Sequence, residues 1–142
     1  MIKQNIVFVE NKAGSLKRVT NMLAANDINI FGFACFDAPE FAIFRMVCNN
    51  PDKAEMILNQ SGYMNRITQA IVVDMKDQVG GLDELLKVLA DSNVSLDYIY
   101  TSFHRKNLTP AVILYAEDIL ATESVLKNHG FTIFNSVEEL EK

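Results

Sequence analysis

The sequence repeats itself at an offset of 66 residues, and no other feature constrains the fold as strongly. The two copies share short β-branched segments and glycines at the same places, as in residues 5–9 with 71–75 and Ala13-Gly14-Ser15-Leu16 with Val79-Gly80-Gly81-Leu82. Near the end of each copy the offset is 68, because a longer hairpin in the second copy adds two residues. A repeat of this size predicts two similar modules in tandem.

Each copy has the element order βαββαβ. Segments rich in β-branched and aromatic residues predict strands, and apolar residues at helical spacing predict helices. The strands are expected at residues 6–9, 28–36, 42–48 and 63–68 in the first copy, and at 71–75, 94–103, 111–116 and 131–134 in the second. The helices are expected to begin at Gly14, Asn50-Pro51, Gly80-Gly81 and Glu117-Asp118. Ser136 and Glu139 have capping-box spacing, which predicts a helical turn in the tail.

Two helices and four strands per copy predict an α+β fold. Both helices of a copy must lie on one sheet face, as in a ferredoxin-like split βαβ sandwich, because each has a single apolar stripe. A unit of about 70 residues has a marginal core alone, and its second strand leaves an edge that invites pairing. We therefore expect the modules, residues 1–69 and 70–135 with a tail at 136–142, to join edge to edge. The result would be an eight-stranded antiparallel sheet with four helices on one face.

Charge and composition argue against several classes of partner. The net charge is −5, whereas a nucleic acid requires a basic face, and the one basic cluster is His104-Arg105-Lys106. The runs without charged residues are too short for a membrane-spanning helix, and the first residues lack an apolar signal segment. We expect a cytoplasmic protein that binds neither nucleic acid nor membrane.

The cysteines and histidines point to no metal, cofactor or catalytic site. Two of each, without ligand spacing, predict neither a metal centre nor a disulfide framework. The hairpin expected after residue 37 would place Cys35 opposite Phe44. It would place Cys48 opposite Phe31, so the two thiols should not meet and should act as small hydrophobes. His129 lies at a helix end, where it is a dipole partner. A small enzyme on this scaffold is an alternative, and it would depend on a histidine or cysteine.

Two segments resemble the ACT domain, a small βαββαβ regulatory module that binds amino acids. They are Glu10-Asn11-Lys12-Ala13-Gly14-Ser15-Leu16 with Asp27-Ile28-Asn29-Ile30, and Lys76-Asp77-Gln78-Val79-Gly80-Gly81-Leu82 with Val94-Ser95-Leu96. The resemblance covers the chain to about Asn135, and its layout is similar to free-standing tandem-ACT proteins without a catalytic domain. The family often has proline before the first glycine, where this sequence has Ala13 and Val79.

The resemblance implies a ligand site at each glycine loop, and the chemistry of an amino acid fits it. A helix N-terminus holds a carboxylate with its unpaired N–H groups, and Asn11 or Asp77 supplies an oxygen for the ammonium. The family pattern also brings residues matching Asn11 and Asn29 to a ligand from opposite sides of an interface. The alternative is that Asn11 only shapes the turn and Asn29 only caps a strand. The candidate binding residues are Asn11, Ala13, Gly14, Ser15, Leu16, Asn29, Ile30, Asp77, Val79, Gly80, Gly81, Leu82 and Ser95.

The resemblance implies a non-catalytic regulatory protein that binds a small ligand, an amino acid by the family pattern, between its two modules. The alternative is an accessory subunit of a metabolic enzyme with vestigial ligand sites. The second strand of the first copy is apolar on both faces and carries Phe31 and Phe33. An apolar open face indicates a partner, so we expect a homodimer or docking to a metabolic enzyme.

Overall fold

The computed structural model describes residues 1–103 and 110–141, and the basic cluster His104-Arg105-Lys106 lies outside them. The described chain is α+β, with antiparallel strand pairs and five helices among its described residues. It divides into two compact units. We call Lys3–Thr68 the first module, and Gln69–Lys142 together with Met1–Ile2 the second module.

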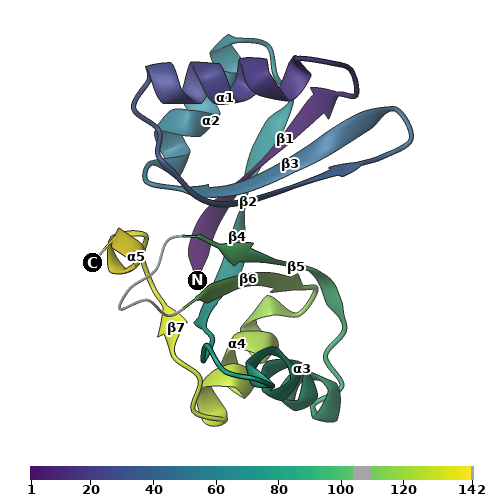
Figure 1. Ribbon diagram of the computed structural model, residues 1–142, viewed down its shortest axis with the longest axis vertical. Helices are drawn as coiled ribbons and strands as arrows, with labels where there is room; N and C mark the ends of the chain where they lie inside the picture. Colours follow the sequence, from purple (N-terminus) through teal and green to yellow (C-terminus); the bar gives the residue numbers. More distant parts are fainter. Residues whose placement is uncertain (104–109, 142) are drawn as a thin grey trace. The chain divides into compact units, whose positions relative to one another are not determined.

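The first module has the predicted order βαββαβ. Its elements are β1 (Ile2–Glu10), α1 (Ser15–Ala25), β2 (Ile30–Asp37), β3 (Phe41–Cys48), α2 (Pro51–Gln60) and the first part of β4 (Asn65–Asp74). The strands pair in the order β4–β1–β3–β2, and α1 and α2 lie side by side on one face of them (Figure 1). This is the ferredoxin-like arrangement that the amphipathic helices predict.

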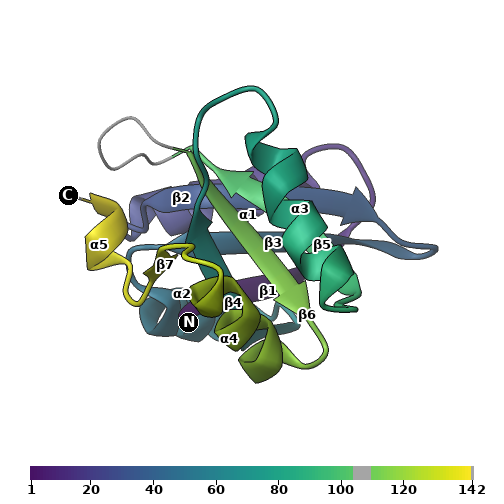
Figure 2. The same ribbon diagram turned by 90° about the horizontal axis from the view of Figure 1, so that it is seen from below.

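The second module repeats this arrangement. Its elements are the rest of β4, α3 (Gly81–Asp91), β5 (Leu96–Ser102), β6 (Ala111–Ala116), α4 (Ile119–Asn128) and β7 (Ile133–Phe134), followed by α5 (Glu138–Glu141) in the tail. The strands pair in the order β7–β4–β6–β5, with β4 in the place that β1 has in the first module. Figure 2 shows α3 and α4 together in front of β4 and β6. The helical turn expected in the tail is confirmed by α5.

Each module has a core of its own between its helices and strands. In the first, Val19 and Leu23 of α1 and Leu58 of α2 pack with strand residues such as Phe44. In the second, the core consists of Ile71, Val73, Leu85, Leu89, Val112, Leu114, Leu126 and Ile133. The repeated apolar positions thus fill equivalent places in the two modules.

The expectation of eight separate strands is wrong for the described residues, which form seven. The sequence predicts a closing strand at residues 63–68 and an opening strand at 71–75. In the structure both belong to one continuous strand, β4, and the boundary between the modules falls inside it, after Thr68. The intervening residues Gln69 and Ala70 contain no turn former, so nothing interrupts the extended backbone.

The two cysteines are free, and the cross-strand partner expected for one of them is wrong. Cys35 pairs with Phe44, as the hairpin predicts, but Cys48 pairs with Ile30 and not with Phe31. The cause is a bulge between Ile30 and Gly32, which shifts the register by one residue. Burial raises the pKa of the Cys48 thiol to about 11, so the group behaves as a neutral core side chain.

Candidate functional site

The first helix of each module begins at a glycine and has no side-chain cap. The N-cap residues of α1 and α3 are Gly14 and Gly80, and neither helix start has a capping hydrogen bond from a side chain. Their φ angles are +81° and +84°, a left-handed conformation that favours glycine over residues with a Cβ. These two glycines are therefore explained by the backbone, and each leaves first-turn N–H groups uncapped.

The second helix of each module has a side-chain cap, in contrast to the first helix of each module. The Asn50 side chain accepts a hydrogen bond from the Lys53 N–H at 3.1 Å at the start of α2. The Asp118 side chain accepts one from the Ala121 N–H at 3.2 Å at the start of α4. Both modules thus cap the helix after their third strand and leave uncapped the helix after their glycine loop.

Gly81 has a different reason to be glycine. A Cβ at this position would collide with the backbone carbonyl of Lys76, whereas a Cβ at Gly14 or Gly80 would meet open space. The loop before α3 folds back on the helix start, and the Gly81 N–H donates to the Gln78 carbonyl at 3.0 Å. The sequence analysis lists Gly81 as a candidate binding residue, whereas close packing of the loop is sufficient to explain why this position is glycine.

Four candidate residues of the second module gather around one hollow. It has a volume of about 450 Å³ and its lining includes Asp77, Gly80, Gly81 and Leu82. The Asp77 side chain is exposed. Val79 is fully exposed and is outside this lining. The Asp77 and Asp83 carboxylates and an uncapped helix N-terminus therefore line the same hollow, which combines acceptors for an ammonium with N–H donors for a carboxylate.

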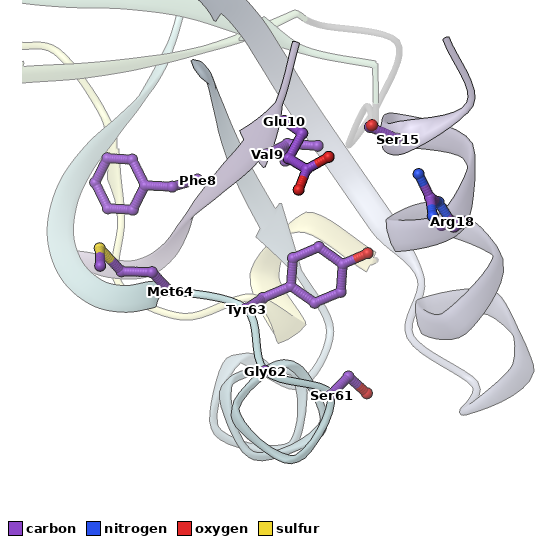
Figure 3. A pocket seen from close by; sticks show the side chains of 9 residues that line it. All are labelled: Phe8, Val9, Glu10, Ser15, Arg18, Ser61, Gly62, Tyr63 and Met64. Atoms are coloured by element: carbon purple, nitrogen blue, oxygen red, sulfur yellow. The ribbon is translucent and has the colours of Figure 1, made fainter. Parts of the chain in front are cut away.

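A second hollow, of about 260 Å³, lies at the start of α1 in the first module (Figure 3). Of the candidate residues it includes Ser15, together with Glu10, Arg18 and Tyr63, which the sequence argument missed. Lys12 donates to the Glu10 carboxylate at 2.7 Å. This bond and the Lys12 charge hold the pKa of Glu10 below its ordinary value, so Glu10 is an anion at neutral pH.

The remaining candidates of the first module lie at the surface of the loop and at the start of β2. Asn11, Ala13 and Asn29 are exposed, and Leu16 and Ile30 are half-buried. The Asn29 N–H donates to the Asn49 side-chain oxygen at 2.9 Å, so the backbone of Asn29 is fixed while its side chain faces solvent. The repeat does not point to Asn49, because the corresponding residue in the second copy is Glu117, a different residue type.

Ser95 lies apart from the glycine loop of its own module. It lines a third hollow, of about 330 Å³, at the end of α3 and the start of α4, together with Asn93 and Asp118. Within the second module the structure thus separates Ser95 from Asp77. The hypothesis that Ser95 joins Asn11 and Gly14 in one site, and that Asn29 joins Asp77 in the other, stays a prediction.

Among the described residues, 1–103 and 110–141, no cluster of histidine, cysteine, aspartate and glutamate could hold a metal ion. The His129 ring nitrogen lies 2.8 Å from the Val125 carbonyl at the end of α4, which agrees with a role at the helix terminus. His104 lies outside the described residues. No helix in the described part of the chain is long and apolar enough to cross a membrane.

Comparison with known proteins gives matches over nearly the whole chain. A family model described as an ACT domain pair matches residues 1–136. Protein BT0572 from Bacteroides thetaiotaomicron is 27% identical, with a TM-score of 0.88, over 99% of this chain and 96% of that one. The regulatory subunits of aspartate kinase from Thermus thermophilus and Thermus flavus are 12% identical, with TM-scores of 0.59 and 0.56. Each match covers 89% of this chain. It covers 89% of the Thermus thermophilus subunit and 91% of the Thermus flavus subunit. No curated protein sequence matches the chain significantly.

Proposed function

Because the chain belongs to the ACT domain pair family, we propose that it is a non-catalytic regulatory protein that binds an amino acid. The ligand carboxylate is held at the uncapped start of α1 or α3. Its ammonium is held by Asn11 or Asp77 in the preceding loop. The solved structures of aspartate kinase regulatory subunits support a regulatory role for this fold. We place the protein in the cytoplasm, where free amino acids report on metabolism.

The observation that carries this proposal is the pattern of helix capping. An uncapped helix N-terminus presents free N–H groups and a partial positive charge, and both stabilise a carboxylate. The chain caps α2 and α4 with Asn50 and Asp118 but leaves α1 and α3 with glycine. A ligand carboxylate would supply the side-chain acceptor that these two helix starts lack in both modules.

We propose further that the two loops differ in strength. Asp77 offers a carboxylate to the ligand ammonium, and Asn11 offers a neutral amide at the corresponding place. A charge-assisted hydrogen bond contributes about 1.5–3 kcal/mol, and a neutral one contributes about 1 kcal/mol. The loop of the second module should therefore bind more tightly. It stays a prediction that the two modules join edge to edge and that Asn29 and Ser95 complete these sites across them.

A thermal-shift screen of the full chain with the common amino acids tests the proposal. An amino acid at about 100 times its dissociation constant should stabilise the fold by roughly 2.7 kcal/mol, which raises Tm by several degrees. A matched control uses the corresponding amino alcohol, which keeps the ammonium and lacks the carboxylate, and it should give no shift. If no amino acid raises Tm, the proposed function is wrong.

The second candidate function is that of an accessory subunit of a metabolic enzyme. The surface that would dock to the enzyme could instead form a homodimer. This candidate is favoured by exposed aromatic side chains on β2 and β3. Phe33 is 51% exposed, Phe36 is 54% exposed and Phe41 is 37% exposed, whereas Phe31 is fully buried. Exposed aromatic residues that gather on one hairpin are typical of an interaction surface.

A further inference from the structure

We propose that the first module contains an additional site for a small carboxylate, in the hollow that Ser15, Arg18 and Tyr63 line. The site lies within one module and adjoins the start of α1, and it differs from the loop site proposed there because it uses Arg18 and Tyr63 instead of Asn11. The hollow of about 260 Å³ opens between the end of β1, the start of α1 and the turn that leads from α2 into β4. The Phe8 N–H donates to the Met64 carbonyl at 3.0 Å and ties two of these walls together.

The first observation is a buried hydroxyl without a partner. Ser15 is the first residue of α1, it is only 4% exposed, and its Oγ has no hydrogen-bond partner among the described residues. Figure 3 shows this oxygen directed from the helix start toward β1, into the hollow. Buried hydroxyls in folded proteins are nearly always satisfied, so an unsatisfied one beside an uncapped helix N-terminus indicates a missing acceptor.

The second observation is the charge around the hollow. Arg18, one turn further along α1, contributes a guanidinium, which binds a carboxylate through two parallel hydrogen bonds. The Tyr63 hydroxyl points toward Arg18 from the opposite wall (Figure 3). Glu10 is the one acidic side chain in the lining, and its charge is already balanced by Lys12 at 2.7 Å. With Glu10 bonded to Lys12, the Arg18 guanidinium and the two hydroxyls, which can both donate, favour an anion over a cation in the hollow.

The third observation is that the second module has lost each of these donors. The position of Ser15 is occupied by Gly81, that of Arg18 by Glu84 and that of Tyr63 by Phe131. The replacements remove two hydroxyls and reverse one charge, while the surrounding backbone is the same. The residues before Tyr63 and Phe131, for example, are glycines with φ of +81° and +84°. The polar lining is thus a property of the first module and not of the fold.

The test is an NMR titration of the full ¹⁵N-labelled chain with acetate, glycine and inorganic phosphate as separate probes. We expect acetate and glycine to shift the amide signals of Ser15, Arg18 and Tyr63 and to leave those of Gly81, Glu84 and Phe131 unchanged. Tighter binding of glycine than of acetate would support the site and show that Glu10 also takes the ammonium. Shifts with phosphate alone, or with none of the probes, would overturn the proposal.

Three variants and two controls test this site and separate it from the loop site at α3. Arg18→Gln should raise the acetate dissociation constant by about tenfold or more, and Ser15→Ala by roughly two- to tenfold. Tyr63→Phe, which copies the second module, should also weaken binding. Lys17→Gln removes an exposed positive charge from the same helix outside the lining and should have no effect. An equal loss in Lys17→Gln would reduce the effect to general electrostatics and overturn the proposal. Asp77→Ala tests the loop site and should leave these shifts intact, so either site can fail without the other.

Discussion

Asn49 holds the backbone of Asn29 on both sides. The Asn29 N–H donates to the Asn49 side-chain oxygen at 2.9 Å, and the Asn49 N–H donates to the Asn29 carbonyl at 3.0 Å. The Asn49 amide group also donates to the Asp27 carbonyl at 3.2 Å, where Asp27 has a φ of +59°. One side chain thus fixes the turn that leads from α1 into β2 and presents Asn29 to solvent.

Replacing Asn49 with alanine should loosen this turn. Two hydrogen bonds of a half-exposed side chain are lost, so we expect the free energy of unfolding to fall by about 1–2 kcal/mol, measured by urea denaturation. Glu117→Ala is the matched control, because Glu117 occupies the corresponding position in the second module. That variant should lose less than about 0.5 kcal/mol. Equal losses in the two variants would contradict the assigned role of Asn49.

The core of the second module should be sensitive to the loss of Leu126. This side chain of α4 is fully buried, and its replacement by alanine should cost about 2–5 kcal/mol of unfolding free energy through lost burial and a residual cavity. Leu120→Ala changes the same helix at a side chain that is 66% exposed and should be nearly neutral. The denaturation midpoints of the two variants measure the difference. A similar midpoint for both would show that α4 is packed differently.

Stability should fall at alkaline pH because of Cys48. Burial raises the pKa of its thiol from 9.0 to about 11, and its Sγ–H donates to the Asn5 side-chain oxygen at 3.5 Å. Above pH 9 the unfolded chain loses this proton while the folded chain keeps it. The stabilisation is therefore complete below the unfolded pKa and is lost as pH rises through the folded pKa, by roughly 3 kcal/mol in total.

Unfolding measured across this pH range in the wild type and in Cys48→Ala isolates the effect. The variant is less stable throughout, because it has a smaller core side chain, but its pH dependence should be flatter by the same amount. Parallel curves for the two proteins would mean that the Cys48 thiol does not titrate as its burial requires.

Self-association is the prediction that follows from the exposed aromatic residues of the β2–β3 hairpin. Light scattering at high micromolar concentration should give a mass above the 16.0 kDa of one chain, and Phe33→Asp should lower it. The control Met64→Asp changes another exposed apolar side chain, 74% exposed, outside this hairpin. A monomeric wild type would leave docking to another protein as the use of this surface.

The repeat predicts the modules, because paired glycines and paired apolar positions are properties of the sequence. It also predicts that Asn50 and Pro51 begin α2, where the Asn50 cap is observed. The repeat does not predict features that depend on long-range packing. The bulge after Ile30 arises from strand pairing, which no local pattern encodes. The continuity of β4 has a local signal in the missing turn former at Gln69 and Ala70, but the repeat directs attention to two separate strands.

The candidate site shows the same division. Gly14 and Gly80 are recognisable in the sequence as helix starts, because a left-handed residue is needed there in both copies. The hollow beside Ser15 is not recognisable, since Arg18 and Tyr63 are 45 positions apart and their counterparts carry different chemistry. Comparing the two copies for the positions at which they differ, instead of those that they share, could have identified this hollow.

Titration calorimetry with the amino acid that gives the largest thermal shift tests the central claim most directly. The wild type should release or absorb heat with a saturable isotherm, Asp77→Ala should weaken the tighter event by about tenfold or more, and Asn11→Ala should weaken it less. Asp91→Ala, which removes an exposed carboxylate at the far end of α3, should match the wild type. No heat with any amino acid, or equal losses in Asp77→Ala and Asp91→Ala, would contradict the account.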